Sequence, residues 1–297
     1  MLTVAMAGTG RMGSAMARAL ARGDVELVLW NRSGGRADDL ARELGARTAA
    51  APAEASAAAD VAISMLADGD AVREVWSGPE GLVAGARPGS VLVDMSTVPP
   101  DTLAEFAEPA RERGAGILDA PVSGSVALAE SGQLTIMAGG SEQDLERARP
   151  VLDLVAKQVT HVGPLGSGAA LKLAVNALIF ALANALSEAL VLAERAGIDR
   201  SLAYEVFTSS AAGAPFVGYK HDAYVDPDGT PVAFSFDLAA KDLGLITQLA
   251  DRLGVPMAQA RVNQALIAEA SAHLGADHDF SAVASHLREL TKEGALG

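Results

Sequence analysis

A glycine-rich turn near the start of the chain constrains the fold more than any other feature. Gly8, Gly10 and Gly13 have the spacing G-x-G-x-x-G in "MAGTGRMGSAM", directly after the apolar run Thr3–Gly8 and at the start of a helical pattern. In this context the first glycine permits a tight turn, the second lets the backbone approach a pyrophosphate, and the third lets helix and strand pack closely. The following helix N-terminus attracts anions. The motif predicts a strand–turn–helix unit that binds a dinucleotide.

Short apolar runs alternate with helical patterns up to Gly163. The strand candidates are Thr3–Gly8, Val25–Trp30, Val61–Leu66, Ser90–Ser96, Gly116–Val122, Leu134–Gly140 and Gln158–Gly163. Amphipathic segments such as "RADDLARELG" lie between most of them. This alternation predicts an α/β Rossmann-type, doubly wound domain over residues 1–163. The last strands have shorter connections, so we expect them to be partly antiparallel.

After Gly163 the strand signals nearly vanish. The run from Ala169 to Glu194 predicts one long central helix that ends at Gly197, because glycine is the typical residue just after a helix. Further helical patterns cover Asp199–Ser210, Ala239–Gly254, Met257–Gly275 and Phe280–Lys292. We therefore expect an all-helical second domain over residues 164–297, with the boundary in the Gly/Pro cluster at 163–168.

Composition and charge exclude several classes of protein. The chain has no cysteine, which excludes disulfides, thiolate metal sites and cysteine nucleophiles. Its 37 acidic and 23 basic residues give a net charge of −14, and no Lys/Arg cluster points to a nucleic acid or an anionic membrane. Histidines and carboxylates do not cluster at a ligand spacing, so we expect no metal site.

The long helix is apolar enough to resemble a membrane span. Asn176, Asn184, Glu188 and Glu194 interrupt it, which favours a core helix packed on all sides over a span. The N-terminus shows no basic region followed by a cleavage-site pattern. We therefore expect a cytoplasmic protein without a membrane partner.

The end of the second strand candidate distinguishes the two nicotinamide dinucleotides. NAD sites usually carry an acidic residue there, about 20 residues beyond the glycines, to bind the ribose 2′-hydroxyl. This chain has Asn31, Arg32 and Ser33 instead. Arg32 can bind a 2′-phosphate through two N–H groups and stack on adenine. The pattern predicts NADP rather than NAD; the alternative is a solvated arginine at a strand end.

Lys172 and Asn176 lie at the head of the long apolar helix, four residues apart and therefore on one face. Oxidation of an alcohol requires a hydride acceptor and a proton acceptor. Lys172 is the best candidate for the second role, because an apolar setting favours the neutral amine. The alternative is a lysine whose stem covers apolar surface, beside a buried asparagine.

Five segments occur in the order of a known family: the glycine turn, "DMST" (Asp94–Thr97), Asp119–Gly140, "GAALKLAVN" (Gly168–Asn176) and "FDLAAKDLGL" (Phe236–Leu245). With them the chain resembles, nearly end to end, the β-hydroxyacid dehydrogenases. This family includes 3-hydroxyisobutyrate dehydrogenase, tartronate semialdehyde reductase and glyoxylate/succinic semialdehyde reductases, and its fold is like that of 6-phosphogluconate dehydrogenase.

The resemblance implies an NADP-dependent dehydrogenase that interconverts a small β-hydroxy acid and its semialdehyde. Lys172 is then the general acid/base and Asn176 holds it or the substrate hydroxyl, while Ser123, Gly124 and Ser125 bind the substrate's carboxylate. The expected cofactor-binding residues are Gly8, Gly10, Arg11, Met12, Gly13, Asn31, Arg32, Ser33, Met65, Leu66, Thr97 and Lys241, the last reaching the cofactor from the helical domain. The resemblance also implies a homodimer or homotetramer assembled through the long helix.

Three alternatives remain open. Ser125, where many members have glycine, is closer to the glyoxylate/succinic semialdehyde reductase branch. An imine reductase would keep the fold, but such enzymes usually lack a lysine at the position of Lys172. A non-catalytic NADP-binding protein would leave Lys172, Asn176 and Ser123 without a purpose.

Overall fold

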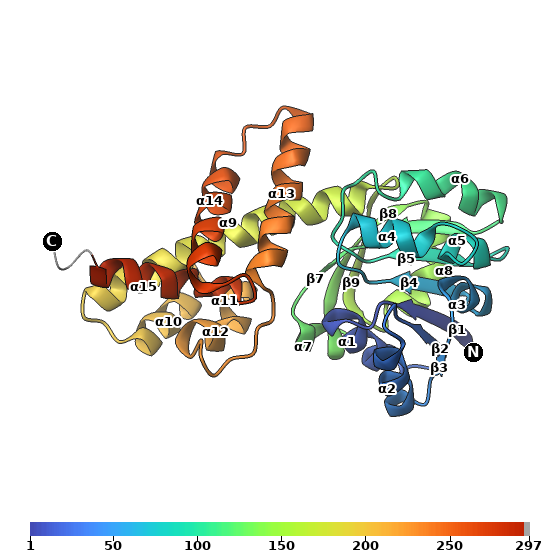
Figure 1. Cartoon of the computed structure of the whole chain (residues 1–297), viewed down its shortest axis with the longest axis horizontal. Coiled ribbons are helices and arrows are strands. Elements are labelled where there is room, and N and C mark those ends of the chain that lie inside the picture. The colour runs from blue at the N-terminus through green and yellow to red at the C-terminus, as the bar shows by residue number, and fades with distance from the viewer. Residues whose placement is uncertain (294–297) are drawn as a thin grey trace. The chain divides into compact units, whose positions relative to one another are not determined.

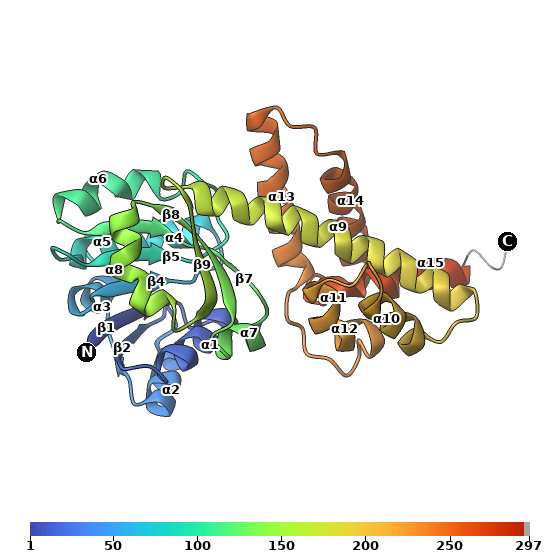
Figure 2. The same cartoon turned by 180° about the vertical axis from the view of Figure 1, so that it is seen from behind.

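The computed structural model describes residues 1–293 and contains two compact units. The chain divides after Lys172, so that residues 1–172 form the first unit and the described residues from Leu173 onward form the second. Figures 1 and 2 show a sheet with helices in the first unit and only helices in the second. This agrees with the predicted Rossmann-type domain followed by an all-helical region.

The first unit is built on one sheet with the strand order β3-β2-β1-β4-β5-β6-β8-β7, and β9 pairs with β8. The strands are β1 (Leu2–Ala7), β2 (Val25–Trp30), β3 (Arg47–Thr48), β4 (Val61–Ser64), β5 (Val91–Asp94), β6 (Gly116–Asp119), β7 (Val122–Ser123), β8 (Leu134–Gly140) and β9 (Ala156–Gly163). From β3 to β6 all pairings are parallel. Strand β1 lies between β2 and β4, so the chain order reverses beside it. Ligands bind at such a reversal, beyond the carboxyl ends of the strands.

Helices cover both faces of the sheet because β1 is buried on both. Val4 and Met6 pack into one core, with α1 (Arg11–Leu20), α2 (Gly34–Leu44) and α8 (Glu142–Leu152). Ala5 and Ala7 pack into the other, with α3 (Pro52–Ala58), α4 (Gly69–Trp76), α5 (Leu82–Gly85) and α6 (Ala104–Glu112). This alternation follows from the period of two along a strand. Each large apolar side chain that is fully buried contributes about 1.5–3 kcal/mol.

The prediction that the last strands are partly antiparallel is confirmed. Strands β6 and β7 both pair antiparallel with β8, whereas β9 pairs parallel with it. The prediction of one strand over Gly116–Val122 is wrong at its centre. It divides at Ala120 and Pro121, because proline has no N–H to donate to a neighbouring strand. The short helix α7 (Val126–Glu130) follows.

The long helix α9 (Ser167–Arg195) begins in the first unit and continues into the second. Its predicted end is confirmed. Gly197 has φ +86°, and the N–H groups of Gly197 and Ile198 bond the carbonyls of Glu194 and Ala193. These are the two hydrogen bonds of a Schellman motif, which satisfies the last carbonyls of the helix.

The remaining helices and part of α9 contribute side chains to a separate apolar core. They are α10 (Arg200–Ser209), α11 (Pro215–Tyr219), α12 (His221–Val225), α13 (Phe236–Leu253), α14 (Ala258–Leu274) and α15 (Val283–Glu293), with a 3-10 turn at Phe280–Ala282. Phe180 of α9, Tyr204, Phe236 and Phe280 belong to this core and are at most 3% exposed.

Helix α9 is long and apolar enough to cross a membrane by length and composition alone, a property it shares with the core helices of many other proteins. The prediction that it is packed on all sides is wrong. Leu178 and Leu192 are 71% and 72% exposed, and Ala185 between them is also exposed. These residues are seven apart, so they form one apolar stripe along the helix.

Candidate functional site

The glycine turn has the geometry of a phosphate-binding turn. A Cβ at Gly13 would lie 1.9 Å from the carbonyl oxygen of Gly8, and a Cβ at Gly8 would lie 2.3 Å from that of Met65. Gly8 also has φ +100°, which other residues rarely adopt. These two glycines let α1 pack directly onto β1 and β4. Gly10 is exposed at the N-cap of α1 and would meet nothing within 4 Å. The open backbone at a helix N-terminus fits a pyrophosphate.

The ends of neighbouring strands are joined around this turn. The Thr9 N–H donates to Asn31 Oδ1 at 3.0 Å, and Asn31 Nδ2 donates to Ser33 Oγ at 2.8 Å. The carboxyl end of β2 is therefore tied to the glycine turn by the side chain of Asn31. The structure thus brings the glycines and the predicted Asn31–Ser33 segment together.

The strands predicted over Val61–Leu66 and Ser90–Ser96 end earlier, at Ser64 and Asp94. Met65, Leu66 and Thr97 therefore follow the carboxyl ends of β4 and β5. The carbonyl of Met65 lies against Gly8, and the Leu66 N–H donates to Ser96 Oγ at 2.9 Å. All three residues are half-buried. They lie on the sheet edge at which α/β proteins bind ligands.

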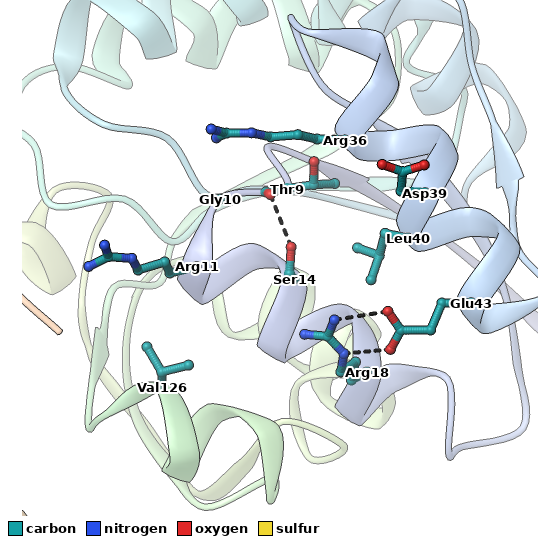
Figure 3. Close-up of a pocket in the computed structure, with 10 residues that line it drawn as sticks. All are labelled: Thr9, Gly10, Arg11, Ser14, Arg18, Arg36, Asp39, Leu40, Glu43 and Val126. Carbon is teal, nitrogen blue, oxygen red and sulfur yellow. Dashed lines mark hydrogen bonds and ion pairs between the residues drawn. The ribbon is translucent and has the colours of Figure 1, made fainter. Parts of the chain in front are cut away.

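A cavity of about 560 Å³ adjoins the turn (Figure 3). It is lined by Thr9, Gly10, Arg11, Ser14, Arg18, Arg36, Asp39, Leu40, Glu43 and Val126. Arg18 is bonded to Glu43 through two hydrogen bonds of 2.7 and 2.9 Å, which closes one end. Arg11 and Arg36 are exposed and border the cavity near Gly10.

The sequence prediction missed Arg36. It lies in the first turn of α2, three residues after Ser33, on a helix that follows directly on β2. A basic residue one helical turn beyond the strand end was the signal that could have revealed it. Met12, by contrast, was predicted and is half-buried against the core beneath the turn.

Arg32 extends into solvent beyond β2. Its side chain is 78% exposed, and Nη1 lies 3.3 Å from Oε2 of Glu74, which is 61% exposed. Exposed ion pairs of this kind contribute little, about 0–1 kcal/mol. The guanidinium can therefore exchange this partner for a ligand anion at small cost.

The predicted carboxylate-binding loop follows β7. Ser123 pairs with Thr135 of β8, and Gly124 has φ +145°. Ser125 is the N-cap of α7, and its Oγ accepts the Leu128 N–H at 3.3 Å. The Ser125 hydroxyl thus has a structural partner, which leaves the Ser123 side chain and the loop N–H groups as the ligand-binding candidates.

Lys172 and Asn176 lie one turn apart in α9, Lys172 half-buried and Asn176 only 7% exposed. Asn176 Nδ2 donates to Asp242 Oδ2 at 2.7 Å, and Lys241 Nζ forms an ion pair of 2.9 Å with Asp242 Oδ1. Asp242 is 1% exposed. The structure therefore joins the predicted Asn176 and Lys241 through a carboxylate that the sequence prediction did not assign to the site. Its adjacency to Lys241 in "AKDLG" was the available signal.

Among the side chains that the structure describes, no three His, Asp or Glu residues gather in a way that could hold a metal ion.

Comparison with known proteins identifies the protein family. Residues 3–163 match the family model of the NAD-binding domain of 6-phosphogluconate dehydrogenase, and residues 166–287 match that of the NADP-dependent 3-hydroxyisobutyrate dehydrogenase. The chain belongs to the β-hydroxyacid dehydrogenase family. Its members are oxidoreductases that act on hydroxyl or aldehyde groups with a nicotinamide cofactor, and this chain is such an enzyme.

Three relatives illustrate the range of this β-hydroxyacid dehydrogenase family. Glyoxylate/succinic semialdehyde reductase 2 of Arabidopsis thaliana is 32% identical over 97% of this chain and 80% of its own. The crystal structure of 3-hydroxyisobutyrate dehydrogenase from Salmonella typhimurium has a TM-score of 0.87 and 30% identity, covering 96% and 99% of the two chains. The structure of Psf3 with NADP+ and 2-OPP has a TM-score of 0.86 and 26% identity, covering 96% and 99%.

Proposed function

We propose that this chain is an NADP-dependent dehydrogenase that interconverts a small β-hydroxy acid and its semialdehyde, with Lys172 as the general acid/base. The observation that carries the proposal is the pairing of Lys172 with a buried, orientationally fixed Asn176 one turn later in α9. This arrangement accompanies a glycine turn that fits a dinucleotide. Small hydroxy and aldehyde acids are the substrates named in the chain's relatives.

Lys172 and Asn176 have complementary roles in this mechanism. A bound cofactor would supply the hydride chemistry, with NADP+ as the acceptor for oxidation and NADPH as the donor for reduction. The neutral amine of Lys172 accepts the hydroxyl proton in oxidation, and its ammonium form donates a proton in reduction. Because Asn176 Nδ2 is committed to Asp242, its Oδ1 remains the acceptor that can hold the lysine or the substrate hydroxyl.

The loop after β7 supplies the site for the acid group. We assign the Ser123 hydroxyl and the N–H groups of Gly124 and Ser125 to the substrate's carboxylate. Successive N–H groups beside a residue with positive φ form a concave site for an anion, and Gly124 has φ +145°.

The preference for NADP rests on the end of β2. In residues 30–36 no acidic side chain is present, while Arg32, Ser33 and Arg36 offer a 2′-phosphate two guanidinium groups and a hydroxyl. The pyrophosphate would be held by the residues of the glycine turn and by Arg11. We assign Met65, Leu66 and Thr97 to the ribose and nicotinamide side, and Lys241 as a further contact to the cofactor.

Within this class we propose a substrate like 3-hydroxyisobutyrate. A glyoxylate or succinic semialdehyde reductase is the second candidate, which the reductase from Arabidopsis supports. The Ser125 that favoured this branch has a local reason to be present, because it caps α7.

A turnover panel with NADPH and NADP+ tests the proposal. Glyoxylate, succinic semialdehyde, methylmalonate semialdehyde and tartronate semialdehyde would be compared as oxidants of NADPH, with 3-hydroxyisobutyrate in the other direction. We expect the highest kcat/KM for methylmalonate semialdehyde. Turnover of a cyclic imine without turnover of any aldehyde acid would replace this proposal with an imine reductase.

We also propose that the chain acts as a homodimer or homotetramer. The stripe of Leu178, Ala185 and Leu192 on α9 exposes large apolar side chains along one helix face. Contiguous apolar surface of this kind is usually covered by a partner. Sedimentation equilibrium would give twice or four times the chain mass of 30.2 kDa.

A further inference from the structure

Asp119 is a buried carboxylate that the proposed mechanism does not use. It ends β6 and is 2% exposed. Its Oδ1 accepts the Gly166 N–H at 2.7 Å, and its Oδ2 accepts the Ala169 N–H at 2.7 Å. Gly166 and Ala169 lie immediately before and within the first turn of α9, the helix that carries Lys172 three residues later.

These two hydrogen bonds take the place of an N-cap side chain from the residue next to α9. The first N–H groups of a helix have no partner inside it and are usually satisfied by a side chain at the N-cap. Gly166, which precedes the helix, has no side chain. Asp119 supplies the acceptors from a distant strand, 47 and 50 residues away in the chain. The start of α9 is thereby fixed to the sheet rather than only to its own turn.

Close backbone packing leaves this turn little room to move. A Cβ at Gly168 would lie 2.3 Å from the Met137 carbonyl oxygen and 2.6 Å from that of Asp119. A Cβ at Gly139 would lie 2.9 Å from the Gly168 nitrogen. The first turn of α9 therefore lies directly against β6 and β8. The two hydrogen bonds to one carboxylate fix both the position of this turn along the helix axis and its rotation about that axis.

Resting on the function proposed above, we propose that Asp119 is a positioning residue for Lys172. The two carboxylate oxygens hold the N–H groups of Gly166, just before α9, and of Ala169, in its first turn, and so set where the amine of Lys172 lies. A displacement of about 1 Å in a catalytic group can cost about 100-fold in rate. Asp119 therefore controls the proton-transfer step without contacting the substrate.

The carboxylate, not merely a polar side chain, is required. Both oxygens accept N–H groups, and only the ionised form is purely an acceptor, because protonation turns one oxygen into an O–H donor. Burial raises the pKa of Asp119 overall, and the hydrogen bonds from the N–H groups of Ala169 and Gly166 oppose this rise because they stabilise the anion. In an Asp119→Asn variant, the amide NH₂ would face one of the two N–H donors, and one anchor would be lost.

Asp119→Asn tests the proposal in the full-length chain with NADPH and its best aldehyde acid. We expect kcat to fall about 100-fold, with the Kd for NADPH changed less than about twofold. The solvent deuterium isotope effect on kcat should rise, because the mispositioned amine slows proton transfer. The matched control is Asp199→Asn. Asp199 is the exposed N-cap of α10 and its carboxylate accepts the Leu202 N–H, so this variant should leave kcat unchanged.

Lys172→Ala, measured in parallel, separates this proposal from the function on which it rests. Wild-type turnover by Lys172→Ala contradicts the proposed function itself. An inactive Lys172→Ala beside an Asp119→Asn that keeps kcat within about threefold refutes only the role of Asp119. A loss of kcat without a larger solvent isotope effect, or an Asp119→Asn chain that is unfolded at the assay temperature, also overturns it, since Asp119 would then serve folding alone.

Discussion

The side-chain amide of Asn176 donates a 2.7 Å hydrogen bond to Oδ2 of Asp242, and both residues are almost completely buried. An ionised carboxylate can only accept, so the bond determines which way the amide of Asn176 faces. The same carboxylate carries the ion pair with Lys241. Asp242 thus sets the orientation of one proposed active-site residue and the place of another.

Replacing Asp242 should therefore impair turnover more than stability. We expect Asp242→Ala to lower kcat about 100-fold, because the amide of Asn176 is no longer held and Lys241 loses its partner. The matched control is Asn263→Ala in α14. It removes a buried 3.0 Å hydrogen bond that Asn184 donates from α9, the helix that also carries Asn176. Both variants should lose about 1–3 kcal/mol of stability. Equal kcat values in the two variants would contradict the role of Asp242.

Two of the glycines should respond differently to the same substitution. In Gly10→Ala the new methyl group meets no protein atom, so the unfolding temperature of the free protein should stay unchanged while the affinity for NADPH falls at least about tenfold. In Gly13→Ala the methyl group would collide with the Gly8 carbonyl, so stability should fall by about 1–3 kcal/mol. Thermal unfolding and NADPH titration of both variants would check this. Unchanged NADPH affinity in Gly10→Ala would place the pyrophosphate elsewhere.

Reversing the charge at Arg32 should change the choice of cofactor. We expect Arg32→Asp to raise the KM for NADPH about 100-fold and that for NADH by less than about threefold, because only NADPH carries the 2′-phosphate. Arg47→Asp on β3 is a matched control, since Arg47 is also exposed and forms only a 3.7 Å pair with Glu26. Parallel steady-state kinetics with both cofactors measure the effect. An equal change for NADPH and NADH would argue against the assignment.

The sequence predicted most of the fold because its signals are local. Strands β2 and β8 have the predicted bounds, and α9 begins two residues before and ends one residue after the predicted run. Strand β3, with two residues, and helices α11 and α12, with five each, are too short to show a period. The division of the predicted strand Gly116–Val122 at Pro121 depends on which strands its two parts pair with. The local sequence pattern carries no information about that pairing.

The candidate site was predicted where residues act within one turn or one strand end. Gly8, Asn31 and Lys172 were predicted from their immediate neighbours in the chain. Asp119 and Asp242 were not, because their partners lie 47 to 66 residues away in the chain and become neighbours only through tertiary packing.

Asp94 should make stability depend on pH. Burial, with a smaller contribution from the nearby Asp119, raises the pKa of Asp94 to about 6, and the hydrogen bonds from Ser64 and Ser96 oppose this rise. The raised pKa favours the folded state at low pH, and this contribution of about 3 kcal/mol is lost as the pH rises from 4 through 6. Asp94→Asn should remove it.

Urea unfolding of both proteins between pH 4 and pH 8 measures this effect. The difference between wild type and Asp94→Asn isolates the group from the other carboxylates, several of which have lowered pKa values and the opposite pH dependence. We expect the wild type to lose about 3 kcal/mol relative to the variant across this range. A difference that stays constant with pH would show that Asp94 does not titrate there.

The central claim is that Lys172 transfers the proton. The most direct test is kcat of Lys172→Ala and Lys172→Arg with a saturating aldehyde acid and NADPH, beside Lys157→Ala at an exposed position of β9. We predict a loss of about 10²–10⁴-fold in both Lys172 variants, because alanine has no amine and arginine stays protonated, with NADPH affinity and unfolding temperature near wild type. Turnover by either Lys172 variant equal to that of Lys157→Ala would contradict the account.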